Sequence, residues 1–302
     1  MIKILFVRNE TAYLPEIGAY IKYFNNVPGF EAFDSGKISS DYDLSEFDVV
    51  WEFKGIGGLK SDDHFIVHEY TSLSTGKFPK TKDIIKSIFN PKPNLRVFLN
   101  ETVERKLNFR DNINFCLRDM GIDEIFLNTR TPKKEYDFVY IGSITKGREI
   151  DKFLNRFTRK NNGKLCLIGE PSSEIYNEYK SNKDIIFTGK VPYEEVPNIA
   201  SKAEFGINYI PDKYPLNLQT STKILEYLAL DLKIITTDYR WISNFEKKYN
   251  CSFYKLSDDS FNVDDLRNFE FKSEFKPEDH LWDIIIGNSK IKDKIIEGIA
   301  KG

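Results

Sequence analysis

The order of short apolar runs along the chain constrains its fold more than any other feature of the sequence. Runs bounded by polar or turn residues are typical of strands that are buried on both faces of a parallel sheet. In the first half they lie at residues 2–7, 48–53, 65–68 and 95–99, with a weaker strand at 114–117. In the second half they lie at residues 137–142, 164–169, 184–188, 205–209 and 233–237.

Segments with apolar residues at helical spacing separate many of these runs. They are residues 14–24, 82–89, 149–156, 173–179, 193–201 and 222–229, whereas the polar residues 34–45 predict a loop. Strands that alternate with helices predict βαβ units with right-handed crossovers. Two such series in a chain of 302 residues predict an α/β protein with two Rossmann-like domains.

A polar stretch at residues 129–135 contains Pro132 and precedes the first strand of the second series, which predicts a domain boundary. We therefore assign residues 1–130 to the first domain and residues 131–281 to the second. The tail from residue 282 to residue 302 has apolar residues at helical spacing and predicts one long amphipathic helix.

Composition excludes several classes of protein. The net charge of -2 gives the protein as a whole no attraction to nucleic acid, and we expect no nucleic-acid partner. No apolar run approaches the roughly 20 residues that a membrane helix needs, and the N-terminal run is too short for a signal peptide. The three cysteines lack the spacing of a disulfide framework or a zinc site, so we expect buried thiols in a cytoplasmic protein.

The residues after the first strand of the second series form the first candidate site. Ligands of open parallel sheets bind beyond the carboxyl ends of the strands. There, Gly142 and Ser143 lead to Lys146 and Arg148. Glycine lets backbone N–H groups approach an anion, and the two cations suit a diphosphate. A loop with two solvated cations is the alternative.

A second turn follows the third strand of this series. Gly189 is followed by Val191 and by a proline that begins a helix, which suits backbone contacts to a flat base. An ordinary turn is the alternative.

The strongest local pattern begins at residue 219 and continues into a helix. Ser221 and Thr222 are good N-cap residues, and free N–H groups beside Lys223 favour a phosphate. Glu226 lies one turn further and is able to accept hydrogen bonds from two ribose hydroxyls. A capped helix with a surface glutamate is the alternative.

The order and spacing of these three segments resemble the donor domain of family 4 (group 1) GT-B glycosyltransferases. The matching segments are residues 142–148, 187–191, 221–229 and 233–238, so the resemblance covers about a third of the chain. It implies a GT-B fold, with a cleft between two Rossmann-like domains and a C-terminal helix that crosses back to the N-terminal domain. The Trp282-Asp283 start of the tail is similar to the start of that helix.

The resemblance implies a glycosyltransferase that moves a sugar from a UDP- or GDP-linked donor to an acceptor hydroxyl. It implies retention of configuration, no metal or other cofactor, and a glycan or lipid-linked acceptor in bacterial surface polysaccharide or glycolipid assembly. The sequence departs from the family at Leu218, which replaces the first glutamate of the Glu-x7-Glu pair. It also departs at Ser143 and Asp231, where arginine and glycine are usual.

The first half is expected to bind the acceptor. Arg8 and Asn9 replace the family's glycine-rich loop after the first strand. His68 is read as the end of a strand where the family often places a histidine near the transferred sugar, and histidine shares protons near neutral pH. A structural or solvated histidine is the alternative. Gly55–Gly58 is either an acceptor or phosphate loop or an ordinary flexible turn.

Residues 77–110 carry nine lysines and arginines against three acidic residues, with apolar residues between them. This pattern predicts peripheral contact with anionic lipid on the inner face of the membrane, or with a lipid-diphosphate acceptor. A solvated helix face is the alternative.

Two other functions fit the same pattern. A nucleotide-sugar epimerase of GT-B build would isomerise or hydrolyse its substrate without an acceptor. A non-catalytic module would bind a nucleotide sugar or a partner without transferring the sugar, and Leu218 favours this alternative.

Overall fold

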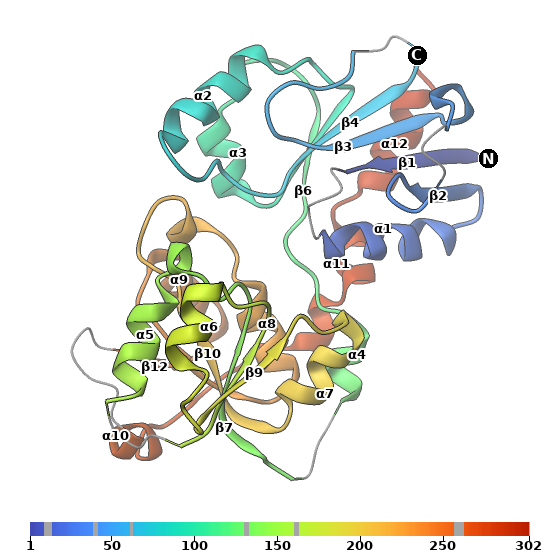
Figure 1. Cartoon of the computed structure of the whole chain (residues 1–302). Helices are drawn as coiled ribbons and strands as arrows, with labels where there is room; N and C mark the ends of the chain where they lie inside the picture. The colour runs from blue at the N-terminus through green and yellow to red at the C-terminus, as the bar shows by residue number, and fades with distance from the viewer. Residues whose placement is uncertain are drawn as a thin grey trace. The chain divides into compact units, whose positions relative to one another are not determined.

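A computed structural model describes residues 1–8, 14–38, 42–60, 63–129, 133–159, 163–256 and 263–301. The chain forms two compact units, Met1–Gly121 with His280–Gly302, and Ile122–Asp279 (Figure 1). Each unit is built on a parallel sheet, which confirms the predicted α/β architecture of two Rossmann-like domains. The sequence analysis placed the domain boundaries between residues 130 and 131 and between residues 281 and 282. Residues 130–132, at the first of these boundaries, lie outside the described residues. So does Asn9, which was predicted to bind the acceptor.

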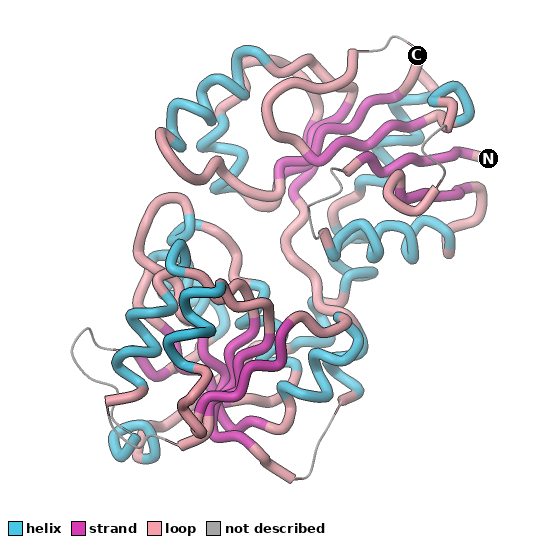
Figure 2. Tube along the Cα trace, in the orientation of Figure 1, coloured by secondary structure: helices cyan, strands magenta, loops and turns pink. Residues whose placement is uncertain are grey.

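The first unit contains a parallel sheet, whose strands are magenta in Figure 2, in the order β2-β1-β3-β4-β5-β6. The strands are β1 (Ile2–Val7), β2 (Phe30–Asp34), β3 (Val49–Phe53), β4 (Phe65–Tyr70), β5 (Leu95–Phe98) and β6 (Phe115–Leu117). The helices are α1 (Pro15–Asn25), α2 (Pro79–Phe89), α3 (Glu101–Leu107), α11 (Trp282–Asn288) and α12 (Ile291–Ile299), with a 3-10 turn at Leu44–Glu46. Helices α1, α11 and α12 share one apolar core with alternate residues of the strands.

The structure of this unit departs from the sequence analysis in three places. The sequence missed β2, because burial alternates along this edge strand and leaves no continuous apolar run. Strand β4 continues past His68 to Tyr70, so His68 is not at its end. The tail is two helices, because Lys290 adopts a left-handed conformation with φ 55° between α11 and α12. The break lets Ile286, Ile291 and Ile295 reach the same core.

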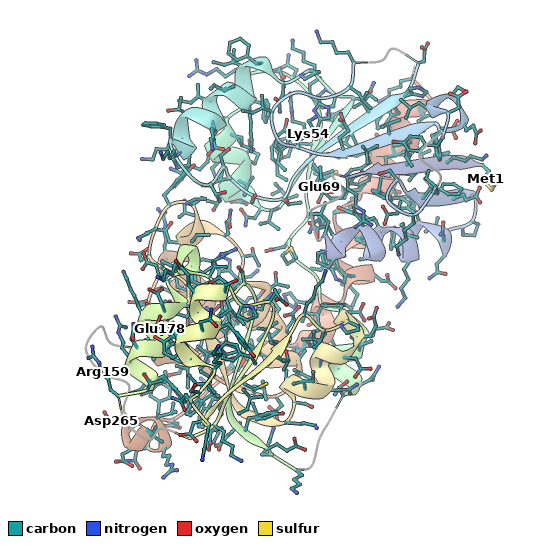
Figure 3. All side chains as sticks on the ribbon, viewed as in Figure 1. Met1, Lys54, Glu69, Arg159, Glu178 and Asp265 are labelled. Atoms are coloured by element: carbon teal, nitrogen blue, oxygen red, sulfur yellow. The ribbon has the colours of Figure 1, made fainter. Side chains whose placement is uncertain are left out.

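A buried ionic cluster joins the returning tail to this sheet. Arg118 is fully buried and forms an ion pair with Glu69 of β4. Glu69, labelled in Figure 3, also accepts a hydrogen bond from Trp51 Nε1 at 2.8 Å. The guanidinium carbon of Arg118 lies 5.4 Å from the ring centre of Trp282 in α11. A side chain at Gly121 would approach the same tryptophan to within 2.5 Å, so glycine allows the chain to leave the unit there.

The second unit has the strand order β12-β11-β10-β7-β8-β9. The strands are β7 (Tyr136–Ile141), β8 (Leu165–Ile168), β9 (Ile185–Gly189), β10 (Ala203–Asn208), β11 (Lys233–Thr236) and β12 (Tyr254–Lys255). The helices are α4 (Glu124–Asn128), α5 (Ile150–Phe157), α6 (Ser173–Tyr179), α7 (Val196–Ala200), α8 (Thr222–Ala229), α9 (Arg240–Tyr249) and α10 (Val263–Arg267). The 3-10 turns of its described residues are η2 (Lys146–Arg148), η3 (Tyr193–Glu195), η4 (Leu216–Leu218) and η5 (Pro277–His280), which ends at the first residue of the returning tail.

Helix α8 is fixed at the point where the strand order of this sheet reverses. From β7 the chain proceeds to β8 and β9 on one side and returns to β10 and β11 on the other. The Tyr227 hydroxyl accepts a hydrogen bond from the Ile141 amide at 2.9 Å and donates one to the Ile207 carbonyl at 3.2 Å. This one side chain therefore ties α8 to both strands that flank the switch point.

The close approach of α8 to β10 requires glycine at position 206. A Cβ atom on Gly206 would lie 2.5 Å from the Tyr227 ring. Overpacking of this kind costs about 1–3 kcal/mol. We therefore expect Gly206→Ala to lower the free energy of unfolding by about that amount, measured by urea denaturation.

Gly18→Ala is the matched control, because Gly18 lies in α1 and a Cβ atom there meets nothing within 4 Å. Alanine in a helix interior is favoured over glycine by about 1 kcal/mol, so this variant should be as stable as the parent or more so. Equal effects of the two substitutions would contradict the packing argument.

Candidate functional site

A pocket of about 230 Å³ lies at the carboxyl ends of β7 and β10, beside the start of α8. This is the switch point of the second sheet, where open α/β sheets bind their ligands. Its lining includes two cations, Arg148 and Lys223, and none of the described lining residues is acidic. The pocket is therefore suited to an anion.

The start of α8 faces this pocket without a side-chain cap. Ser221 occupies the N-cap position, but its hydroxyl donates to Asn208 Oδ1 at 2.7 Å instead of accepting from the first turn. Ser221 therefore stands at the predicted N-cap position, but its side chain does not cap the helix. Ser221, Thr222 and Lys223 line the pocket, so the partial positive charge of the helix start is directed at its contents.

Asn208 holds this arrangement and was missed by the sequence analysis. It ends β10, is buried, and its amide nitrogen donates to Thr236 Oγ1 and to the Tyr239 hydroxyl, each at 2.9 Å. Its amide oxygen is the acceptor for Ser221. A polar residue at the end of an apolar strand was the signal that could have identified it.

Glu226 lies one turn into α8 and is buried, not on the surface. Its Oε1 accepts a hydrogen bond from the Tyr193 hydroxyl at 3.3 Å, and its Oε2 lies 3.7 Å from Lys223 Nζ. Oε2 is buried without a hydrogen-bond donor. Burial raises the pKa of Glu226, and Lys223 and Tyr193 partly oppose this effect. A ligand hydroxyl would supply the missing donor.

The loop after β7 divides its residues between the pocket and the surface. Gly142 has φ 143°, which favours glycine, and together with Ser143 and Arg148 it lines the pocket. Lys146 is not among the lining residues. Its Nζ lies 3.2 Å from Glu174 Oε2, and both side chains are more than half exposed.

The turn after β9 lies outside this lining. Gly189 ends the strand with φ 68°, and Val191 follows it as a half-buried residue. The nearby Tyr193, in η3, carries the hydroxyl that reaches Glu226. This hydrogen bond connects the turn to α8, so the second and third predicted segments are in contact.

In the first unit, His68 lies within the sheet. Glu52 of β3 and Arg96 of β5 flank it in register. Its Nε2 lies 3.2 Å from Glu52 Oε2, and both ring nitrogens are buried. Burial lowers the pKa of His68, opposed by Glu52, so the neutral ring is favoured. Lys54, labelled in Figure 3, lies 3.4 Å from the same carboxylate.

Arg8 follows β1 and is directed to the edge of the sheet. Its Nε lies 2.9 Å from Asp34 Oδ1, at the end of β2. Its backbone amide donates to the Ser35 hydroxyl at 3.2 Å. The arginine therefore fixes the turn after β2.

The described residues lack a cluster of metal ligands and a membrane-spanning helix. They hold no group of three or more histidines, cysteines, aspartates or glutamates placed to bind a metal ion. Within the same ranges, no helix has the length and apolar character needed to cross a membrane.

Comparison with solved structures identifies the fold. The chain is similar over its full length to AviGT4, a glycosyltransferase involved in avilamycin A biosynthesis, with a TM-score of 0.64, 12% identity and 99% of that chain covered. The TM-score is 0.63 with sucrose-phosphate synthase from Thermosynechococcus elongatus, at 10% identity, with 100% of this chain and 97% of that chain covered.

Anabaena HepE, crystallised with UDP and glucose, gives a TM-score of 0.59 at 9% identity, with 100% of this chain and 98% of that chain covered. No protein-family model matches the sequence, and no curated protein matches it significantly. The likeness to these structures shows that the chain has the GT-B fold, as the sequence predicted.

The burial of Glu226 leads to a prediction about stability. Burial penalises the ionised carboxylate of Glu226, whereas glutamine has the same shape and no charge. We expect Glu226→Gln to be more stable than the parent at neutral pH, measured by urea denaturation. Because the folded protein holds the proton of Glu226 above its ordinary pKa of 4.5, the parent loses stability as pH rises from 4.5 through the raised pKa. The difference in free energy of unfolding between Glu226→Gln and the parent should therefore grow from pH 4.5 to the raised pKa and stay constant above it.

Glu194→Gln is the control, because Glu194 lies exposed in η3. It should leave stability nearly unchanged at every pH. A Glu226→Gln variant that is less stable than the parent at neutral pH would show that its ionised carboxylate stabilises the fold.

Proposed function

We propose that this protein is a glycosyltransferase that moves a sugar from a nucleotide-sugar donor to an acceptor hydroxyl. The observation that carries the proposal is the cationic pocket at the switch point of the second sheet, with an uncapped helix start beside it. The GT-B fold supports the same reading, since the AviGT4 structure that it resembles is described as a glycosyltransferase.

The pocket is assigned to the diphosphate of the donor. Its volume of about 230 Å³ is below the roughly 300–1,000 Å³ of pockets that enclose whole ligands, so it suits part of a nucleotide sugar. When the bond to the sugar breaks, negative charge develops on the leaving diphosphate. Arg148, Lys223 and the amides at the start of α8 stabilise that charge. Gly142 and Ser143 contribute backbone contacts, and Lys146 is left out because it pairs with Glu174.

The nucleoside is assigned to the region between α8 and the turn after β9. Glu226 accepts from the ribose hydroxyls, with Oε2 as the oxygen that still needs a donor. Gly189 and Val191 contact the base through their backbone. UDP is the first nucleotide to test, because HepE was crystallised with it, and GDP is the second.

The finer features of the reaction are proposed from the family resemblance. Transfer proceeds with retention, by attack on the same face that the diphosphate leaves, and needs no metal ion. The acceptor is a glycan or a lipid-linked sugar, and the protein works in the cytoplasm in the assembly of a bacterial surface polysaccharide or glycolipid. Because Leu218 replaces the first glutamate of the family pair, the donor sugar ring is held by other groups.

Calorimetry with UDP tests the diphosphate site. A charged hydrogen bond to phosphate contributes about 1.5–3 kcal/mol, so Arg148→Ala and Lys223→Ala should each weaken UDP binding by tenfold or more. Lys146→Ala is the matched control and should bind UDP like the parent, because that lysine faces Glu174. GDP is titrated in parallel to identify the base.

Equal affinity in the parent, Arg148→Ala and Lys223→Ala would refute this site. Incubation of nucleotide sugars with acceptor extracts then separates the competing functions. Transfer to an acceptor supports the proposal, isomerisation or hydrolysis without an acceptor indicates an epimerase, and binding without any turnover indicates a non-catalytic module.

The role of His68 at the transferred sugar stays a prediction. General acid–base catalysis contributes about 10²–10⁴-fold. If His68 acts there, His68→Gln should lower kcat by at least about a hundredfold while UDP affinity and the urea midpoint are kept. Glu52→Gln, on the neighbouring strand, is the comparison variant. If His68→Gln lowers the urea midpoint and leaves kcat unchanged, His68 has a structural role in the sheet and no catalytic one.

A further inference from the structure

Helix α2 is amphipathic, but it is docked with its polar side inward. Asp83, Lys86 and Asn90 are 3%, 8% and 8% exposed, whereas Ile84 and Ile88 are 58% and 66% exposed. A surface helix of a soluble protein normally turns its apolar stripe to the core. The apolar stripe of α2 therefore lacks a partner within the described part of the chain.

Specific hydrogen bonds hold α2 in this orientation. Asp83 Oδ1 accepts from the Ser74 amide at 2.9 Å. Asn90 donates to the Gly55 carbonyl at 3.0 Å and to the Tyr70 hydroxyl at 3.3 Å, and it accepts from the Gly57 amide at 3.0 Å. Asp83 and Asn90 thus tie the inward side of the helix to the rest of the unit, and this fixes the outward direction of the isoleucines.

Two phenylalanines extend the exposed apolar surface. Phe89, at the end of α2, is 72% exposed, and Phe78, just before its start, is 77% exposed. Phe78 has φ 52°, a left-handed conformation that is strained for an aromatic residue. We define Phe78, Ile84, Ile88 and Phe89 as the α2 face. Ile84 and Ile88 lie one turn apart and so adjoin on the surface, and exposed apolar surface of this kind marks an interaction site.

The charge around the α2 face identifies the kind of partner. Lys77, Lys80, Lys82 and Lys92 flank or begin the helix and are exposed, and Lys80 lies on the same stripe as Ile84 and Ile88. The acidic residue of this segment, Asp83, is buried on the other side. An exposed face with large apolar residues and a rim of lysines is complementary to a membrane surface with anionic head groups.

We propose that the α2 face docks this protein on an anionic lipid bilayer. The isoleucines and phenylalanines enter the head-group region, and the lysines contact the lipid phosphates. Figure 1 shows α2 in the first unit, whereas the pocket at α8 belongs to the second. The proposal does not depend on the proposed function, and it holds whether or not the chain transfers a sugar.

Flotation with lipid vesicles tests the proposal. The full chain is mixed with vesicles of phosphatidylcholine alone or of an equal mixture of phosphatidylcholine and phosphatidylglycerol. We expect the parent to float with the mixed vesicles only. Ile84→Glu/Ile88→Glu and Lys77→Glu/Lys80→Glu should each reduce binding by about tenfold or more, since apolar burial and lysine contacts both contribute.

Matched variants elsewhere separate the α2 face from general surface effects. Ile296→Glu changes an isoleucine of α12 that is 44% exposed, and Lys247→Glu/Lys248→Glu reverses two exposed lysines of α9. Both should float like the parent. UDP affinity, measured on every variant, shows whether the pocket of the second unit is intact, independently of lipid binding.

Three outcomes would overturn the proposal. The parent fails to float with either kind of vesicle, or Ile84→Glu/Ile88→Glu floats like the parent. In the third, light scattering shows that the parent forms a dimer which Ile84→Glu/Ile88→Glu abolishes, and the parent does not float. That result would assign the face to a second copy of the chain.

Discussion

The contact between Tyr227 and Gly206 determines where α8 lies, and the candidate site depends on that position. The bare glycine lets the ring approach β10, and the Tyr227 hydroxyl joins β7 to β10 where the strand order reverses. The Ser221 hydroxyl donates its hydrogen bond to Asn208 Oδ1, so it does not cap the helix. The result is a helix start without a side-chain cap, beside Arg148 and Lys223, in a pocket whose described lining contains no acid.

The burial of Glu226 in α8 lowers the stability of the folded protein, because a buried carboxylate is penalised when it ionises. Its carboxylate is buried in α8, and Oε2 is left without a hydrogen-bond donor. Buried polar atoms without a hydrogen-bond donor persist where the surrounding structure fixes them, and they are common at functional sites. The α2 face of the first unit is a second departure from ordinary burial, because its apolar side chains are outside and its polar ones inside. We infer that a ligand hydroxyl donates to Glu226 Oε2 and that a lipid surface covers the α2 face.

Local signals in the sequence predicted much of the fold. The apolar strands are found close to their predicted bounds, and α8 spans Thr222–Ala229 as predicted, because its apolar spacing and its N-terminal serine are local features. The partners of single side chains depend on tertiary packing, which spacing does not encode. The hydroxyl of Ser221 bonds to Asn208, Lys146 turns to Glu174, and β4 extends beyond His68, each through residues distant in the sequence or through sheet pairing.

The central claim is that the start of α8 binds the diphosphate of a nucleotide, and amide NMR tests it directly. UDP and uridine are titrated separately into the isotope-labelled protein, and the amide resonances of Thr222 and Lys223 are followed. The account predicts that UDP shifts both resonances strongly and that uridine leaves them near their starting positions. Resonances that stay fixed with UDP, or that move equally with uridine, would contradict it.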